Sequence, residues 1–154
     1  MKLLAAILLC AGLALPAGDP AGFHQWNASD LKQTVAGLVD KLTPAGSASS
    51  PMASLENYSF SAALRRTSGG AEIHKTNNDL FVVQSGEATL IVGGTIPDAS
   101  EAQPNEVRGS SIVGGVEKKM AAGDIITIPA GMPHQMKVEK GKEIAYIAIK
   151  IKKP

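Results

Sequence analysis

From residue 57 onward, apolar residues alternate with polar or small ones, and glycine or proline interrupts the alternation repeatedly. A period of two places alternate side chains on the same face of a β-strand. Many short strands separated by turn residues are typical of a β-sandwich or a β-barrel. The predicted strands cover residues 58–64, 71–75, 80–83, 88–92, 111–113, 116–121, 124–128, 133–139 and 144–151. The sequence therefore predicts an all-β domain over residues 57–154.

One short helix is predicted ahead of this domain. Apolar residues recur at helical spacing from Leu31 to Leu42. Ser29 is the expected N-cap, because a serine hydroxyl accepts a hydrogen bond from a free amide in the first helical turn. Residues 44–53 are rich in serine, alanine and proline, which predicts a loop. Residues 19–56 are therefore expected to form an arm, a helix and a loop.

The first 18 residues have the pattern of a secretory signal peptide. Lys2 is followed by an uncharged apolar run and then by the small residues Ala17 and Gly18. The run is too short for a membrane helix, which needs about 20 residues. Cys10 is the only cysteine, and Leu9 before it disfavours lipid attachment, which usually requires a small residue there. We therefore expect a secreted or periplasmic protein without a membrane span after cleavage.

The charge balance argues against a nucleic-acid partner. The chain has 15 lysines and arginines against 14 aspartates and glutamates, whereas nucleic-acid-binding domains are usually clearly basic. Three lysines gather near the C-terminus, at Lys150, Lys152 and Lys153. We interpret them as a solvated strand end.

Two segments carry residues that suit metal chemistry. In the first, Glu72 and His74 lie two residues apart in a predicted strand, so their side chains share one face. Asp79 opens the next strand, a hairpin's distance away, and can face the same space; Gly86 closes that segment. In a solvated strand face these carboxylates would be unremarkable, but inside a barrel they would need a cation to neutralise them.

The second segment places a histidine after a sharp bend. Gly123 starts a turn, a buried apolar strand follows, and Pro129 and Gly131 then bend the chain. His134 begins the next predicted strand, and the bend directs its ring.

Together the two segments resemble the motifs of the cupin superfamily. Its second motif reads Gly, five residues, Pro-x-Gly, two residues and His, and residues 123–134 match every fixed position. Its first motif reads His-x-His, three or four residues, Glu, six residues and Gly. Here Glu72 stands at the first His and Asp79 at the Glu, while Val138 replaces an Asn usual beyond the second motif. The chain is similar to small secreted single-domain bacterial cupins of the type-2 kind.

This resemblance implies a fold and a ligand set. The fold is a double-stranded β-helix, a jelly-roll barrel with its metal inside. The implied ligands are His74 and His134, with Asp79 and Glu72 as carboxylate ligands. Such a set suits one divalent metal, with Fe or Mn favoured by the extra carboxylate and Zn or Ni as alternatives. Gly86, Gly123, Pro129 and Gly131 are implied as structural motif residues, and pairing of barrels implies a homodimer.

Three functions remain open. The first is a metal-dependent oxygenase or isomerase acting on a small polar molecule in the barrel. The second is a non-catalytic cupin module that binds a small molecule or a metal, since fold does not decide function. The third is partner binding through the N-terminal arm and residues 97–110, which predict a polar loop. Arg108 in that loop is either a surface residue or a contact for an anionic substrate.

Overall fold

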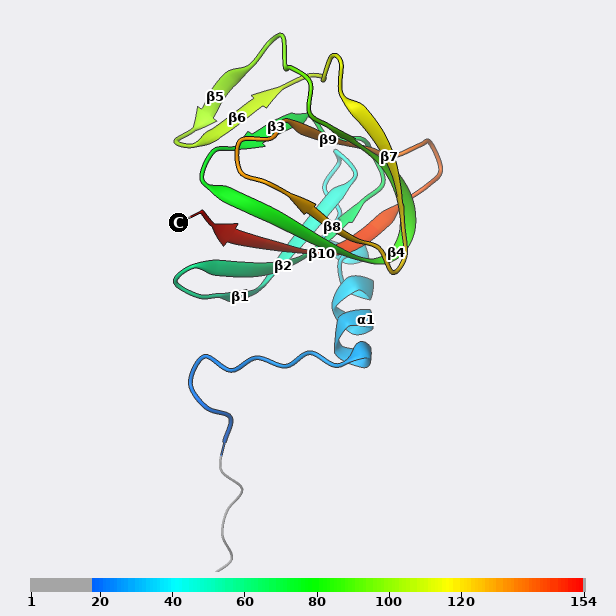
Figure 1. The fold of residues 1–154 in the computed structure, drawn as a ribbon. Coiled ribbons are helices and arrows are strands. Elements are labelled where there is room, and N and C mark those ends of the chain that lie inside the picture. Colours follow the sequence, from blue (N-terminus) through cyan, green and yellow to red (C-terminus); the bar gives the residue numbers. More distant parts are fainter. Residues whose placement is uncertain (1–17, 154) are drawn as a thin grey trace, which may run out of the picture.

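The computed structural model describes residues 18–153. Residues 1–17, which make up nearly all of the predicted signal peptide, and residue 154 lie outside the described part. In the described part, one antiparallel sheet curls into a barrel, and helix α1 packs beneath it (Figure 1). The elements are α1 Ala28–Ala36, the 3₁₀ helix η1 Val39–Lys41, β1 Ser47–Ser54, β2 Tyr58–Arg65, β3 Ala71–His74, β4 Asn77–Val92, β5 Ser100–Gln103, β6 Glu106–Gly109, β7 Val116–Ala121, β8 Ile125–Ile128, β9 His134–Lys137 and β10 Ile144–Lys152. The prediction of an all-β barrel with one short helix is confirmed.

Strand β4 joins the two sides of the barrel. Its first half pairs with β10 and β8, and its second half pairs with β7 and β9. The sequence predicted two strands here, at 80–83 and 88–92, and the structure has one continuous strand of 16 residues. Gly86, which was interpreted as the end of the first strand, lies inside β4 with a φ of 75°. The chain therefore changes sheets without a loop.

Helix α1 begins earlier and ends earlier than predicted. Asn27, and not Ser29, is its N-cap, and the Asn27 side chain accepts hydrogen bonds from the Ser29 and Asp30 amides. The Asp30 carboxylate in turn accepts from the Asn27 amide, which completes a capping box. The apolar spacing continues past Ala36 because the chain then forms the short 3₁₀ helix η1. Leu38, just before η1, is fully buried.

The predicted loop at 44–53 is wrong, because most of it is strand β1. This strand lies at the edge of the sheet and pairs with β2 along its length. Pro51 was interpreted as a loop residue. It lies at a bulge in this edge strand, where a missing N–H is tolerated. The sheet therefore begins at Ser47.

The prediction of a polar loop over residues 97–110 is also wrong in part. This segment contains the hairpin β5–β6, which turns at Asn105 with a φ of 67°. Strand β6 pairs with β3 in the register Glu72–Arg108 and His74–Glu106. The hairpin thus brings two further charged residues beside the predicted metal ligands.

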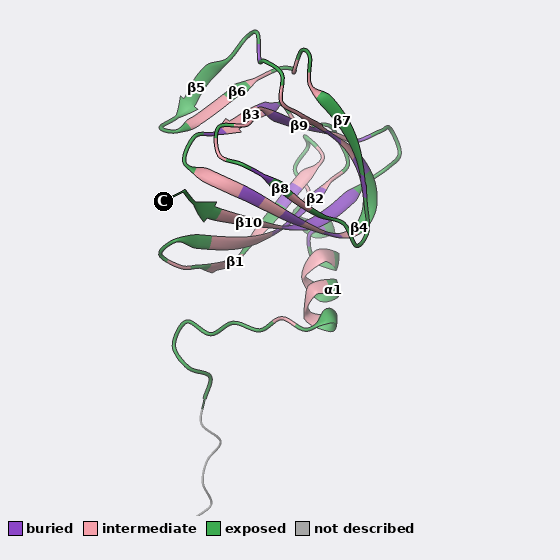
Figure 2. Cartoon of the chain, viewed as in Figure 1, coloured by how far each residue is buried: buried purple, intermediate pink, exposed green. Residues whose placement is uncertain are grey.

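Two apolar clusters hold the barrel together (Figure 2). The first fills the barrel interior and includes Val83, Leu90, Met120 and Ile144. The second lies between the sheet and the N-terminal helices around Leu38. The cavity that remains in the interior is lined partly by members of the first cluster and partly by the predicted site residues Glu72, His74 and Asp79.

Candidate metal centre

The four predicted ligands come from three strands that meet inside the barrel. Glu72 and His74 share one face of β3, Asp79 lies near the start of β4, and His134 begins β9. Glu72 is the register partner of His134 across the β3–β9 ladder. The structure therefore brings all four residues together, although they are separated by up to 62 positions in the chain.

The distances between their polar atoms are short. Asp79 Oδ2 lies 3.3 Å from His74 Nε2 and 3.5 Å from His134 Nε2. Glu72 Oε1 lies 3.4 Å from His134 Nε2. One ligand atom each from Glu72, His74 and His134 falls within 4.8 Å of the others. The two histidines and Asp79 are buried, with at most 6% of each exposed. This spacing makes the cluster a candidate metal site.

Both imidazoles turn the same nitrogen toward the cluster centre. His74 Nδ1 lies 2.6 Å from Glu106 Oε2, and His134 Nδ1 lies 3.1 Å from the Met132 carbonyl oxygen. A carboxylate and a carbonyl only accept hydrogen bonds, so each Nδ1 carries the proton and donates it. Each Nε2 then presents a lone pair to the cluster, as metal-bound histidines do.

The bend between β8 and β9 fixes His134 beside His74. Gly131 has a φ of 83°, a left-handed conformation that glycine adopts without strain, and its amide donates to the His74 carbonyl oxygen at 2.8 Å. Met132 N donates to Pro129 O at 3.1 Å and closes the turn. The Gly-Pro-Gly pattern recognised in the sequence therefore has a direct structural consequence at the site.

Comparisons with known proteins agree with this architecture. No family model and no curated protein matches the sequence. Among solved structures, the cupin domain of Cnp3 from Schizosaccharomyces pombe is 10% identical, with a TM-score of 0.52 over 70% of this chain and 65% of that one. The chain has the cupin fold. A double-stranded β-helix protein from Klebsiella pneumoniae is similar (15% identity, 73% and 85% coverage, TM-score 0.53), as is an oxalate oxidase in complex with glycolate (18%, 89% and 62%, TM-score 0.53).

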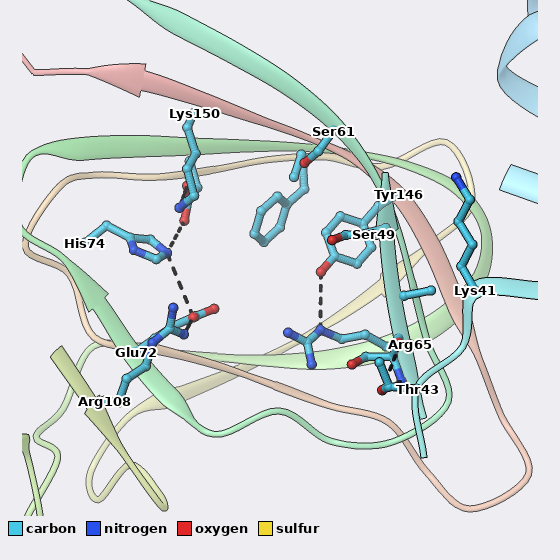
Figure 3. Close-up of a pocket in the computed structure, with 16 residues that line it drawn as sticks. Lys41, Thr43, Ser49, Ser61, Arg65, Glu72, His74, Arg108, Tyr146 and Lys150 are labelled. Atoms are coloured by element: carbon cyan, nitrogen blue, oxygen red, sulfur yellow. Dashed lines mark hydrogen bonds and ion pairs between the residues drawn. The ribbon is translucent and has the colours of Figure 1, made fainter. Parts of the chain in front are cut away.

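The chain carries two basic residues in contact with the candidate ligands. The Arg108 guanidinium forms an ion pair with Glu72 Oε2 and lies 3.3 Å from Glu106 Oε2. Lys150 Nζ lies 3.0 Å from Asp79 Oδ1. Figure 3 shows the Lys150 side chain reaching toward His74. Glu72 and Asp79 are therefore each held by a cation through one oxygen, while the other oxygen faces His134.

Sequence reasoning missed part of this arrangement. Lys150 was interpreted as a solvated strand end, but it lies opposite Asp79 in the β10–β4 ladder and faces the interior. The available signal was the period of two, which puts Lys150 on the same strand face as Tyr146 and Ala148. Glu106 was missed because it lies in a segment predicted to be a loop. Arg108, offered as a surface or a substrate contact, meets the cluster instead.

The two histidines are held neutral. Burial lowers the pKa of both His74 and His134 below the ordinary value of 6.5. The charge on Asp79 opposes this effect at both rings, and Lys150 reinforces it. A neutral imidazole that carries its proton on Nδ1 cannot donate from Nε2. The lone pairs of both rings and the carboxylate oxygens therefore face each other without a proton between them. His134 Nε2 has no hydrogen-bond partner among the described residues.

This donor set fits a divalent metal. A cation at the centre would receive the two bare imidazole nitrogens and the inward oxygens of Glu72 and Asp79. Two imidazoles with one or two carboxylates are ligands that Fe, Mn, Zn and Ni accept. The carboxylates of Glu72, Asp79 and Glu106 exceed the cations of Lys150 and Arg108 by one formal charge, so the cluster also attracts a cation electrostatically.

Proposed function

We propose that this cupin holds one divalent metal through Glu72, His74, Asp79 and His134, and that it binds or transforms a small polar molecule beside it. The single observation that carries the proposal is the buried, unpartnered His134 Nε2. It is aimed at Asp79 Oδ2 and Glu72 Oε1 at 3.5 and 3.4 Å. A buried acceptor facing other acceptors costs free energy unless a cation joins them.

Fe or Mn is the favoured metal within this proposal, with Zn or Ni as alternatives. Carboxylate oxygens suit the harder metals, and this site has two carboxylates where the usual motif has one. When bound, such a metal supplies Lewis acidity and, for iron, a means of activating oxygen. We therefore favour oxygenase- or isomerase-type chemistry. The oxalate oxidase of the same fold is bound to glycolate, a small polar ligand.

The protein's own groups have defined tasks in this proposal. Glu106 accepts the proton of His74 Nδ1 and so orients that ring. Lys150 and Arg108 hold the carboxylates of Asp79 and Glu72 in place. Lys150 Nζ also faces the cavity and is the nearest proton donor to Asp79.

A second candidate is a non-catalytic cupin module. The observation in its favour is that Asp79 and Glu72 are already paired with Lys150 and Arg108. In a non-catalytic module these contacts are structural ion pairs that hold the two carboxylates in place. In this alternative the barrel binds a small molecule, with or without a metal, and releases it unchanged.

Metal content tests the proposal directly. We expect near-stoichiometric metal in the purified wild-type protein by plasma mass spectrometry, and loss of the metal in His134→Ala. His24→Ala is the matched control, because the ring of His24 stacks on Trp26 in the N-terminal arm and takes no part in the cluster. It should keep the wild-type metal content.

The outcomes separate the two candidates. Metal in the wild type and in His24→Ala, with none in His134→Ala, supports the metal site and identifies the ion. Turnover of screened substrates by the loaded protein then favours the enzyme over the binding module. An absence of metal in all three proteins, even after incubation with each candidate ion, would overturn the metal site.

We also propose that the protein is secreted or periplasmic and that it pairs into a homodimer. The first proposal rests on the pattern of residues 1–18, and the second on the cupin resemblance alone. N-terminal sequencing of the exported protein tests cleavage after Ala17 or Gly18, and sedimentation tests the dimer.

A further inference from the structure

The candidate metal centre lies at one end of a longer cavity of about 520 Å³. Alternate residues of the strands line this cavity, because one face of each strand points inward. On β10 they are Tyr146, Ala148 and Lys150, and on β2 they are Ser61, Ala63 and Arg65. The cavity therefore extends along the strands from the metal centre toward Arg65.

The middle of the cavity is apolar. The rings of Phe81 and Tyr146 lie with their centroids 4.9 Å apart, and Ala63 and Ala148 complete this stretch of wall. Phe81, Tyr146 and Ala63 are also members of the interior apolar cluster. A ligand that passes through this stretch would bury carbon atoms against carbon atoms.

The far end of the cavity is polar and positively charged. The Arg65 Nε–H donates to Tyr146 Oη at 3.4 Å, and the guanidinium points into the cavity (Figure 3). Lys41 and the hydroxyls of Thr43 and Ser49 line the same end. Among residues 18–153, no carboxylate forms an ion pair with Arg65, whereas its neighbour Arg66 pairs with Glu143 at 2.8 Å.

Arg65 and Arg108 also repel each other across the cavity. The charge on Arg65 lowers the pKa of Arg108, in addition to the larger lowering by burial. The positive charge of Arg108 is neutralised by the carboxylates of Glu72 and Glu106, whereas no carboxylate among residues 18–153 pairs with Arg65. An anion bound beside Arg65 would relieve this repulsion and would satisfy the planar fork of donors that a guanidinium presents.

The backbone register sets the separation of the two ends. Lys150 lies opposite Ser59 on β2, and Arg65 is six residues further along that strand. This corresponds to about 20 Å between backbone positions, which the long side chain of Arg65 shortens by reaching into the cavity.

We propose that this cavity recognises an elongated dianion, with one anionic group at the metal centre, a hydrocarbon chain against Phe81 and Tyr146, and the second anionic group at Arg65. The placement of the first group rests on the proposed function. The second group is recognised by Arg65 whether or not a metal is bound. The ligand class is therefore α,ω-dicarboxylates and related two-headed anions.

Calorimetric titration with defined probes tests this inference. Glutarate and adipate are compared with pentanoate and hexanoate, which have the same carbon number and one carboxylate fewer. We expect the diacids to bind at least about tenfold more tightly to the metal-loaded protein, because a charged hydrogen bond contributes about 1.5 kcal/mol or more. Oxalate, which has no hydrocarbon chain to pack against Phe81 and Tyr146, should gain less than adipate.

Arg65→Ala should remove the advantage of the diacids, and Arg65→Lys should restore part of it. Arg66→Ala is the matched control, because it removes an adjacent guanidinium that pairs with Glu143 outside the cavity. Equal diacid affinities in Arg65→Ala and Arg66→Ala would overturn the inference, provided that both variants show the wild-type unfolding midpoint.

Metal content separates this inference from the proposed function. A metal-loaded protein that does not distinguish diacids from monoacids contradicts the dianion inference and leaves the metal site intact. A protein without metal, in which Arg65→Ala still weakens adipate binding about tenfold or more relative to Arg66→Ala, contradicts the proposed function and supports the role of Arg65.

Discussion

The two ends of strand β4 differ in what they contribute to the molecule. The inward face of its first half carries Asp79 and Phe81 into the cavity, and the inward face of its second half carries Ala88 and Leu90 into the close-packed apolar interior. The backbone is the same continuous strand throughout. The difference lies in what the side chains meet: charged groups at one end and close-packed hydrocarbon at the other.

This contrast indicates that stability and function are separated along the barrel. Burying apolar side chains is the main favourable contribution to folding. Burying histidines and carboxylates opposes folding unless they are paired with partners or with a cation. We therefore expect changes in the apolar half to affect unfolding, and changes in the polar half to affect ligand and metal affinity.

The largest effect should come from the apolar half. Leu90 is 2% exposed and packs in the interior cluster. Leu90→Ala should lower the free energy of unfolding by about 2–5 kcal/mol, because it removes buried methyl groups and leaves a cavity. Urea unfolding measures this loss, and metal affinity of the folded fraction should not change. Val113→Ala, at a position 58% exposed, is the control and should shift unfolding by less than about 0.5 kcal/mol.

A loss of metal affinity in Leu90→Ala that matches its loss of stability would contradict the separation. It would mean that the two halves of the barrel form a single cooperative unit that the metal also stabilises.

The second effect should be confined to the polar half. Glu106 contacts His74 Nδ1 and not the cluster centre, so it acts as a positioning residue. Glu106→Gln should weaken metal binding about 10- to 100-fold, as changes to partners of metal-bound histidines do. Competition with a coloured chelator measures this affinity. Glu101→Gln is the matched control in the same hairpin, because Glu101 pairs with Lys75 at the surface.

Equal metal affinities in Glu106→Gln and Glu101→Gln would contradict the role of Glu106. The orientation of His74 would then be fixed by packing alone.

The same contrast explains what the sequence could and could not predict. The predicted strands at 116–121 and 144–151 were placed almost to the residue. The four candidate ligands were found because fixed spacing and Pro-Gly turns mark them locally. Strand β1 was missed because its serines and its one proline, Pro51, have weak strand preference, and pairing with β2 stabilises it instead.

Charged partners from distant strands were the hardest to predict. Lys150 meets Asp79 only through the β10–β4 register, and Glu106 meets His74 only because β6 pairs with β3. The period of two indicates which face of β10 carries Lys150, but neither pairing itself leaves a local pattern in the sequence. For the same reason Arg65 could not be distinguished from Arg66, although one faces the cavity and the other faces Glu143.

The smallest effect should be a pH dependence of stability that originates in the polar half. In the metal-free protein the folded pKa values of His74 and His134 lie below the unfolded value of 6.5. Above about pH 6.5 both rings are neutral in both states, and their contribution to stability is complete. As the pH falls below that value, the two histidines bind protons in the unfolded chain but remain neutral in the folded chain. The free energy of unfolding therefore decreases. The attraction of Asp79 for both rings offsets part of this effect and keeps it small.

Urea unfolding in a chelator, at about pH 7.5 and about pH 5.5, measures this dependence in a range where ordinary carboxylates do not titrate. His134→Gln removes one of the two titrating rings and should flatten the profile, whereas His24→Gln should not. Stability that rises toward the lower pH would show that Glu72 and Asp79 hold the histidines protonated. The polar half would then be a self-sufficient ion-pair network, with no unpartnered acceptor left for a metal to join.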